Sequence, residues 1–124
     1  MDLLIPETKN TPKLFYKSSS NTWLISGRSY PKEAMVFYEP LLDWISQCEL
    51  NSGVNCSFEF KLEFFNTCSS KVLLDALVRL RKLVERGKLN LSVKWYYEVD
   101  DEDMKDNGES LMELAQLPFE LVSI

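Results

Sequence analysis

The sequence predicts a mixed α/β fold in which helices pack mainly on one face of a mixed β-sheet. Two segments alternate strictly between apolar and polar residues, which is typical of strands that bury one face and expose the other. The segment between them has apolar residues at helical spacing instead, and its length suits a crossover between parallel strands. We therefore expect one domain, residues 1–124, with the element order β-β-α-β-α-β-α-β.

The N-terminal region predicts an irregular segment followed by a hairpin. Residues 1–12 contain two prolines and several polar residues, so we expect an irregular lead-in there. Two short β-prone runs, Lys13–Tyr16 and Thr22–Ser26, are separated by the polar segment 17–21. This arrangement is typical of two antiparallel strands joined by a turn.

The next segment predicts a helix from about Pro31 to about Cys48. A proline is tolerated in the first helical turn, where its missing N–H has no intrahelical partner. Pro40 lies further along and removes a hydrogen bond to the carbonyl of Val36, so we expect a kink there. The side chains expected on the inner face recur at helical spacing: Ala34, Phe37, Leu41, Trp44 and Cys48.

Three strands and two helices are expected in the rest of the chain. Asn55–Phe65 and Leu89–Tyr97 are the two alternating strands, and Phe119–Val122 is a short last strand. In the first of them the inward positions are Cys56, Phe58, Phe60, Leu62 and Phe64. Helices are expected at about Ser69–Arg86, capped by Gly87, and at about Glu102–Gln116. The first of these helices should bury Leu73, Leu77, Leu80 and Val84.

The composition excludes several kinds of enzyme. The 124 residues include no histidine, so the chain cannot use Ser-His-Asp or Cys-His catalysis or bind zinc through imidazole. Its four glycines are too scattered for a glycine-rich dinucleotide-binding or phosphate-binding loop. We expect no catalytic residues, no cofactor and no enzymatic activity.

The charge balance argues against nucleic acid as a partner. The chain has 14 basic and 19 acidic residues, whereas binding to phosphates requires a basic excess. The charges are also unevenly spread: residues 71–88 contain six basic and two acidic side chains, and residues 98–124 contain nine acidic and one basic. This distribution fits either two solvated faces or a bipolar surface that steers a charged partner.

The cysteines and the N-terminal sequence predict a cytoplasmic protein without membrane insertion. Residues 1–30 lack the basic start and long apolar stretch of a secretory signal, and no window approaches a membrane span. Cys48, Cys56 and Cys68 are odd in number and form no C-x-x-C pair, which is typical of free thiols in a reducing compartment.

An acidic cluster at residues 100–106 raises the question of a metal site. A calcium loop starting at Asp101 would need glycine where Asp106 stands and glutamate where Met112 stands. An acidic first turn of the third helix is the simpler interpretation, because the helix dipole favours carboxylates there. A small-molecule or metal site that uses this cluster is kept as an alternative.

Residues 65–71 join the clearest strand to the second helix. Their Asn, Thr and Ser side chains can cap the helix by accepting hydrogen bonds from its free N–H groups. A hydroxyl at this position can also be phosphorylated, since a phosphate there meets unpaired N–H groups and the positive end of the helix dipole. On the residues alone, capping is the simpler of the two interpretations.

Five blocks of the sequence resemble the SiaC family of bacterial regulatory phosphoproteins. They run in order from about Thr11 to the C-terminus. The blocks are Ile25–Pro31, Phe37–Trp44, Leu62–Thr67, Trp95–Glu98 with Asp100–Met104, and Pro118–Glu120. The resemblance implies a fold like that of anti-sigma factor antagonists (STAS-like proteins), which agrees with the element order above.

The resemblance also implies three protein partners. These are a serine/threonine protein kinase (SiaB-like), a PP2C-type phosphatase (SiaA-like) and a diguanylate cyclase (SiaD-like). In the family, the unphosphorylated form binds and activates the cyclase, which raises cyclic di-GMP and promotes aggregation and biofilm formation. A constitutive scaffold subunit without a switch is the other alternative.

The family's phosphorylated threonine matches Thr67, within the Phe-Asn-Thr block. The expected partner contacts surround it: Phe65, Asn66, Cys68, Ser69, Ser70 and Lys71. Phe65 is out of register with the buried alternation of its strand, so it either offers an apolar contact or is partly buried at the strand end. Cys68 stands where relatives are expected to carry serine, which leaves the acceptor intact but bears on recognition by the kinase.

Overall fold

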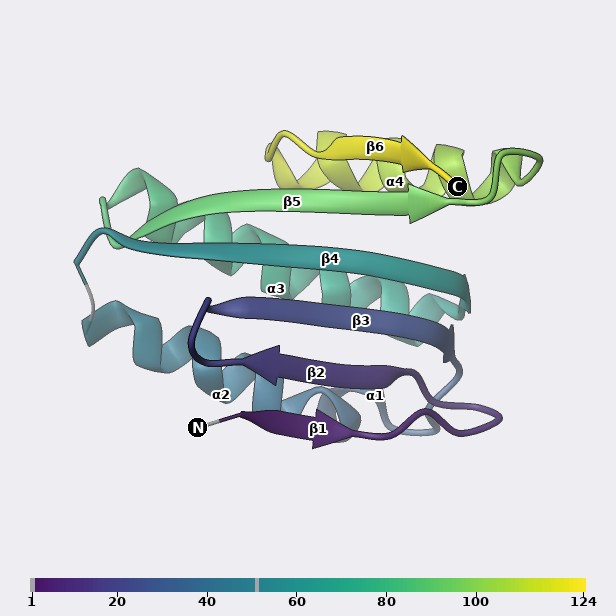
Figure 1. Ribbon diagram of the computed structural model, residues 1–124, viewed down its shortest axis with the longest axis horizontal. Coiled ribbons are helices and arrows are strands. Elements are labelled where there is room, and N and C mark those ends of the chain that lie inside the picture. Colours follow the sequence, from purple (N-terminus) through teal and green to yellow (C-terminus); the bar gives the residue numbers. More distant parts are fainter. Residues whose placement is uncertain (1, 51) are drawn as a thin grey trace.

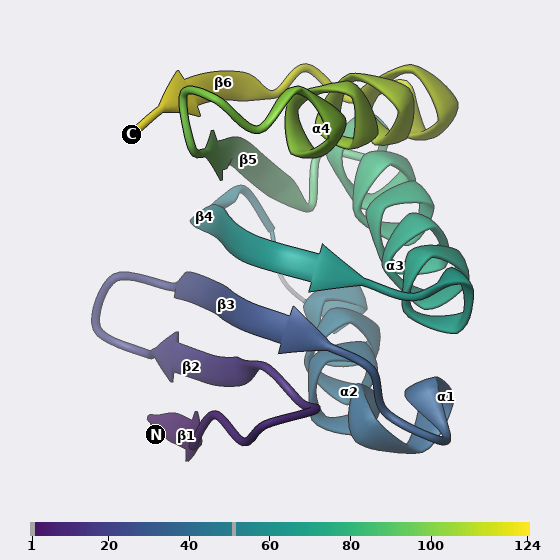
Figure 2. The same ribbon diagram turned by 90° about the vertical axis from the view of Figure 1, so that its right-hand side faces the viewer.

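The computed structural model describes residues 2–50 and 52–124, which form a six-stranded sheet covered by helices on one face (Figures 1 and 2). The strands are β1 (Leu3–Ile5), β2 (Lys13–Lys17), β3 (Thr22–Ser29), β4 (Val54–Phe65), β5 (Leu89–Tyr97) and β6 (Glu120–Ser123). The helices are α1 (Ala34–Phe37), α2 (Glu39–Gln47), the short 3-10 helix η1 (Cys48–Leu50), α3 (Thr67–Glu85) and α4 (Glu102–Ala115).

The strands lie side by side in chain order from β1 to β6. β1, β2 and β3 pair antiparallel, as expected for hairpins, whereas β3 to β6 pair parallel. Each parallel connection passes through helical structure, and Figure 2 shows all four α-helices on the same side of the sheet. The predicted mixed sheet with helices on one face is therefore confirmed. In the part of the chain that the structure describes, no helix is long and apolar enough to span a membrane.

Two expectations at the N-terminal end were wrong. The segment 1–12 is not irregular throughout, because Leu3–Ile5 pairs with β2 and adds an edge strand. The first helix begins at Ala34 instead of Pro31 and is interrupted at Tyr38, so it forms two helices. Pro40 falls in the first turn of α2, where its missing N–H has no intrahelical partner, and it therefore starts a helix where a kink was expected.

The core lies between the helices and the inward face of the sheet. Trp23, Phe58 and Trp95 are its largest strand side chains and are almost fully buried. From α3, Leu73, Leu77 and Leu80 are buried as predicted. The last inward position is one residue earlier than expected: Leu83 is buried, and Val84 is only partly buried against the core.

A bulge in β4 reverses the alternation at its C-terminal end. Gly27 of β3 pairs with Leu62, but the next residue, Arg28, pairs with Phe64, so the ladder skips one residue of β4. An extra residue on one strand turns the following side chains to the opposite face. The expectation that Phe64 is buried was therefore wrong: its side chain is 44% exposed, and Phe65 faces the helices instead.

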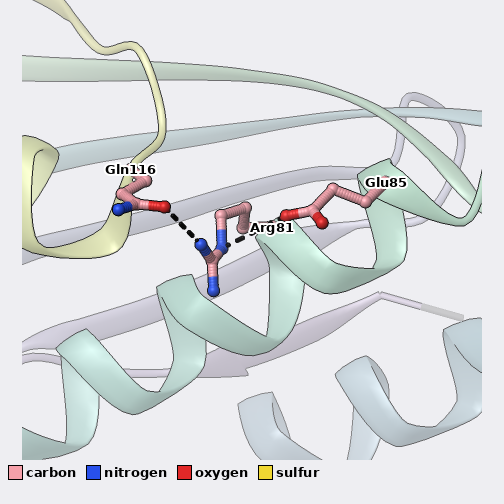
Figure 3. A network of polar contacts seen from close by, with 3 residues as sticks. All are labelled: Arg81, Glu85 and Gln116. Carbon is pink, nitrogen blue, oxygen red and sulfur yellow. Dashed lines mark hydrogen bonds and ion pairs between the residues drawn. The ribbon is translucent and has the colours of Figure 1, made fainter.

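A polar contact fixes α3 to the connection between α4 and β6 (Figure 3). Arg81 donates from Nη1 to Oε1 of Gln116 at 2.6 Å, and its Nε lies 3.5 Å from a carboxylate oxygen of Glu85. Gln116 ends α4 in the left-handed conformation, with φ of 56°. The guanidinium therefore links the C-terminal end of α4 to the last turns of α3 at the surface.

Candidate functional site

The N-terminus of α3 presents Thr67 to solvent. Asn66 is the N-cap, and its side-chain oxygen accepts a hydrogen bond from the backbone N–H of Ser69 at 2.8 Å. Thr67 is the first residue of the helix and is exposed. The sequence signal for capping was therefore correct, and the capping residue is Asn66, which leaves the Thr67 hydroxyl uninvolved in the cap.

A buried cluster of three hydroxyl groups lies directly beneath this helix start. Ser29 Oγ, at the end of β3, lies 2.6 Å from the Tyr38 hydroxyl and 2.7 Å from Ser69 Oγ. Ser69 Oγ also donates to the backbone carbonyl of Ser29 at 3.2 Å. All three side chains are 0% exposed, and burial raises the pKa of Tyr38 to about 12. Ser69 therefore faces the core and not the surface on which we expected a partner.

Of the two phenylalanines before Asn66, Phe65 packs against the core and Phe64 is exposed, which is the reverse of what the alternation predicted. Phe65 packs edge-on against Trp95, with ring centroids 6.0 Å apart, so it belongs to the strand end and the core. Phe64 lies outside and stacks on Tyr30 at 4.5 Å with nearly parallel rings. Sequence reasoning missed this exposed aromatic pair, because the bulge that turns Phe64 outward leaves no signal in the alternation.

A groove runs beside Thr67 between α1 and α3. Its cavity measures about 510 Å³ and is lined by Ala34, Met35, Cys68, Lys71, Val72, Asp75 and Arg79. Two of the residues expected at the site, Cys68 and Lys71, are thus brought together there. Sequence reasoning did not predict that α1 forms one side of the groove. The available signal was the adjacent apolar pair Met35 and Val36, since both side chains are exposed on this short helix.

The groove has an apolar floor and a charged rim. Ala34 and Val72 are each 5% exposed and form part of the floor, whereas Met35 is 56% exposed. Asp75 and Arg79 form an ion pair at 3.0 Å on the helix surface. Lys71 takes part in none of the four ion pairs that join described residues, so its ammonium group is available to an anion.

The acidic cluster at residues 100–106 has a structural role. Asp101 caps α4 by accepting a hydrogen bond from the backbone N–H of Met104 at 3.0 Å. Glu102 and Asp103 occupy the first turn of the helix, where the dipole favours carboxylates. Within residues 2–50 and 52–124, no three acidic or cysteine side chains are arranged to hold a metal ion.

Comparison with known protein families decides the identity of the chain. A model of the SiaC family of regulatory phosphoproteins matches residues 5–124. The chain belongs to the SiaC family. The resemblance found in the sequence is thereby confirmed for nearly the whole chain. A curated relative, an uncharacterized protein of Pseudomonas aeruginosa (strain UCBPP-PA14), is 25% identical over 95% of this chain and 93% of its own length.

Solved structures of SiaC have the same fold as this family member. Apo-SiaC from Pseudomonas aeruginosa superimposes with a TM-score of 0.87 at 24% identity, over 99% of each chain. A second match is to the crystal structure of the diguanylate cyclase SiaD in complex with its activator SiaC, also from Pseudomonas aeruginosa. Its TM-score is 0.90 at 24% identity, over 99% of this chain and 100% of that chain.

Proposed function

We propose that this SiaC-family protein is a cytoplasmic, non-enzymatic regulator whose unphosphorylated form binds and activates a diguanylate cyclase. A serine/threonine kinase phosphorylates Thr67 and a PP2C-type phosphatase removes the phosphate. The active form raises cyclic di-GMP and so promotes aggregation and biofilm formation. Membership of a family of regulatory phosphoproteins supports the proposal, as does the complex in which the Pseudomonas aeruginosa relative is the activator of SiaD.

The observation that carries the proposal is the position of Thr67. Its side chain is exposed at the first position of a long helix, next to a groove that includes Cys68 and Lys71. Asn66 supplies the cap without using the Thr67 hydroxyl, which leaves that hydroxyl available to a kinase. Ser69 is buried by comparison, and Ser70 is only partly exposed.

Phosphorylation at this position is expected to leave the fold intact. A phosphate adds nearly two negative charges, which the positive end of the helix dipole and the nearby Lys71 both favour. The contacts that fix the start of α3, through Ser69 and Asn66, do not involve the Thr67 side chain. The effect of the phosphate is therefore on binding: it changes the charge and shape of the surface beside the groove.

The proposal is tested by treating the purified protein with its partner kinase and measuring cyclase binding by calorimetry. We expect one phosphate on Thr67 and a loss of at least tenfold in affinity for the cyclase. Thr67→Ala should remove the phosphate signal in intact-mass measurements, and Ser70→Ala is the matched control that keeps it. Equal cyclase affinity of the phosphorylated and unphosphorylated forms would contradict the switch, and labelling of the Thr67→Ala variant would move the site elsewhere.

A further inference from the structure

A second cavity lies between α2 and the N-terminal strands. It measures about 380 Å³, and its lining includes Tyr16 of β2, Trp23 of β3 and, from α2, Asp43 and Trp44. We infer that it binds a small alkylated ammonium compound that also carries an oxygen acceptor, as choline does. Three features support this inference: an aromatic wall, an acidic rim and a buried indole N–H.

The cavity and Thr67 lie toward opposite ends of the sheet. Trp23 is near the start of β3, whereas Thr67 follows the end of β4, which runs parallel to β3. In Figure 1, β3 begins at the left of the sheet and β4 ends at the right. The residues that line the cavity come from neither α1 nor α3. The inference is therefore independent of the proposed function.

Three aromatic residues form one wall of the cavity. The ring centroid of Tyr16 lies 5.0 Å from that of Trp23 and 5.5 Å from that of Trp44, and the two indoles pack edge-on at 5.9 Å. The face of an aromatic ring attracts a cation that lies within about 6 Å of its centroid. Methyl groups on the nitrogen add apolar contact with such rings, so a methylated ammonium suits this wall better than a strongly hydrated primary ammonium.

The rim of the cavity carries negative charge. Asp43 is exposed there and takes part in none of the four ion pairs that join described residues. Asp2 lies nearby, since its Oδ1 accepts hydrogen bonds from the backbone N–H and the Oγ of Ser18, which also lines the cavity. The described residues of the lining include no lysine or arginine. The cavity therefore favours a cation over an anion.

Trp23 supplies an unused hydrogen-bond donor. Its Nε1 is buried and has no hydrogen-bond partner within residues 2–50 and 52–124. Buried indole N–H groups usually have one, as in Trp95, whose Nε1 donates to the carbonyl of Met104 at 2.9 Å. A ligand oxygen that reaches the Trp23 Nε1 accepts this hydrogen bond, while the ammonium group contacts the aromatic wall and Asp43. This combination selects amino alcohols and betaines over simple tetraalkylammonium ions.

Titration with choline, followed by nitrogen–proton correlation NMR, tests the inference on the unmodified protein. The indole N–H signal of Trp23 should shift to lower field and saturate as choline is added. The signal of Trp95 is the internal control and should stay in place, because that N–H already donates to a carbonyl. Tetramethylammonium lacks the oxygen and dimethylbutanol is the uncharged isostere of choline, so each should bind at least threefold more weakly.

Two variants separate the contributions of charge and hydrogen bonding. Asp43→Asn should weaken choline binding at least threefold. Glu113→Gln is its matched control, because it removes the same charge from an exposed position on α4 outside the cavity, and it should stay within twofold of the wild type. Trp23→Phe keeps an aromatic ring but removes the donor, so it should weaken the binding of choline and leave that of tetramethylammonium unchanged. Circular dichroism verifies that each variant is folded.

Several outcomes would overturn the inference. If the Trp23 signal does not respond to choline, the indole N–H has no use for a ligand oxygen and is satisfied by the edge-on ring of Trp44. If dimethylbutanol binds as tightly as choline, or if Asp43→Asn and Glu113→Gln bind choline equally well, the cavity does not select a cation.

A vesicle experiment identifies the source of the ammonium group. Binding of free choline without co-sedimentation on phosphatidylcholine vesicles supports a soluble ligand. Co-sedimentation that Asp43→Asn abolishes supports the same chemistry in a lipid headgroup. Neither result bears on the phosphorylation of Thr67 or on cyclase binding, so the proposed function is tested separately.

Discussion

At the scale of single residues, Ser29 is the shared partner in a buried cluster beneath the proposed phosphorylation region. Its hydroxyl joins Tyr38, at the junction of α1 and α2, to Ser69, in the first turn of α3. Buried polar groups are costly when unpaired, so each member depends on the others. The orientation of Thr67 and of the adjacent α1 is thus set by contacts inside the protein, beneath the surface that the kinase and the cyclase are proposed to meet.

The raised pKa of Tyr38 predicts a loss of stability at alkaline pH. Burial raises this pKa from 10.0 to about 12, so the folded state favours the neutral phenol. The stabilisation is fully present below pH 10 and is lost as the pH rises from 10 towards 12. Tyr38→Phe cannot ionise, and at neutral pH it should lower the free energy of unfolding by about 1 kcal/mol through the lost hydrogen bond.

Urea denaturation across this pH range measures the effect. The difference in stability between the wild type and Tyr38→Phe should shrink as the pH passes 10. Burial also raises the pKa of Cys56 to about 12, but that thiol is present in both proteins and cancels in the difference. If the free energies of unfolding of the two proteins change with pH in parallel, the pKa of Tyr38 is not raised in the folded state.

Gly108 predicts a second effect at the residue scale, because α4 packs closely on Trp95. A Cβ added at this position would lie 2.5 Å from the indole ring, which is itself held by a hydrogen bond from its Nε1 to the carbonyl of Met104. Gly108→Ala should therefore destabilise the protein by about 1–3 kcal/mol, although alanine is the better helix former. Asn107→Ala, on the exposed side of α4, is the control and should change stability by no more than about 0.5 kcal/mol. A stabilised Gly108→Ala variant would contradict the close packing.

At the scale of elements, the cap of α3 predicts how the proposed phosphorylation region responds to a local change. Asn66→Ala removes the side-chain acceptor for the Ser69 N–H and should cost about 1 kcal/mol in the free energy of unfolding. Asn66→Asp keeps an acceptor and should retain most of the stability. Hydrogen exchange checks the location: the amides of the first turn of α3 should exchange faster in Asn66→Ala alone. Unchanged exchange in that turn would mean that the cap does not hold the helix start.

The helices and strands also show which parts of the fold sequence periodicity can predict. Alternation predicted the strands β4 and β5, and helical spacing predicted α3, all with nearly correct ends, because burial imposes these periods directly. The bulge opposite Gly27 was not predictable in this way, since one skipped residue changes the facing of Phe64 and Phe65 without changing the composition. Gly27 has φ of 106° there, a conformation that favours glycine, but the glycine alone does not say which strand carries the extra residue.

At the scale of the whole molecule, the candidate site depends on contacts that are distant in sequence. Met35 and Lys71 line the same groove because β3 and β4 are adjacent parallel strands, so the segments that follow them begin at the same edge of the sheet. The local sequence predicted only a helix start around Thr67, and the family resemblance pointed to Thr67 itself. The sequence contained no local motif for the half of the groove that α1 supplies, because that half follows from strand order.

The uneven charge distribution leads to a prediction about association kinetics. The positively charged stretch 71–88 lies in a chain of net charge -5, so a negatively charged surface of a partner is attracted to this stretch locally. Salt screens such attraction, with a Debye length of about 10 Å at 0.1 M and about 3 Å at 1 M. The association rate constant with the proposed cyclase partner should therefore fall severalfold between about 0.05 and 0.5 M salt, whereas dissociation changes less.

Stopped-flow measurements at several salt concentrations test this prediction, with Lys71→Glu as the informative variant. The wild-type association rate should decrease steeply with salt, and the variant should show a flatter dependence because a positive charge beside Thr67 is replaced by a negative one. Lys17→Glu, outside the groove, should keep a slope close to that of the wild type. If Lys71→Glu and Lys17→Glu reduce the salt dependence of the association rate equally, the electrostatic steering comes from net charge alone. A slope that is preserved only in Lys17→Glu would assign the steering to the groove beside Thr67, where a phosphate would remove it.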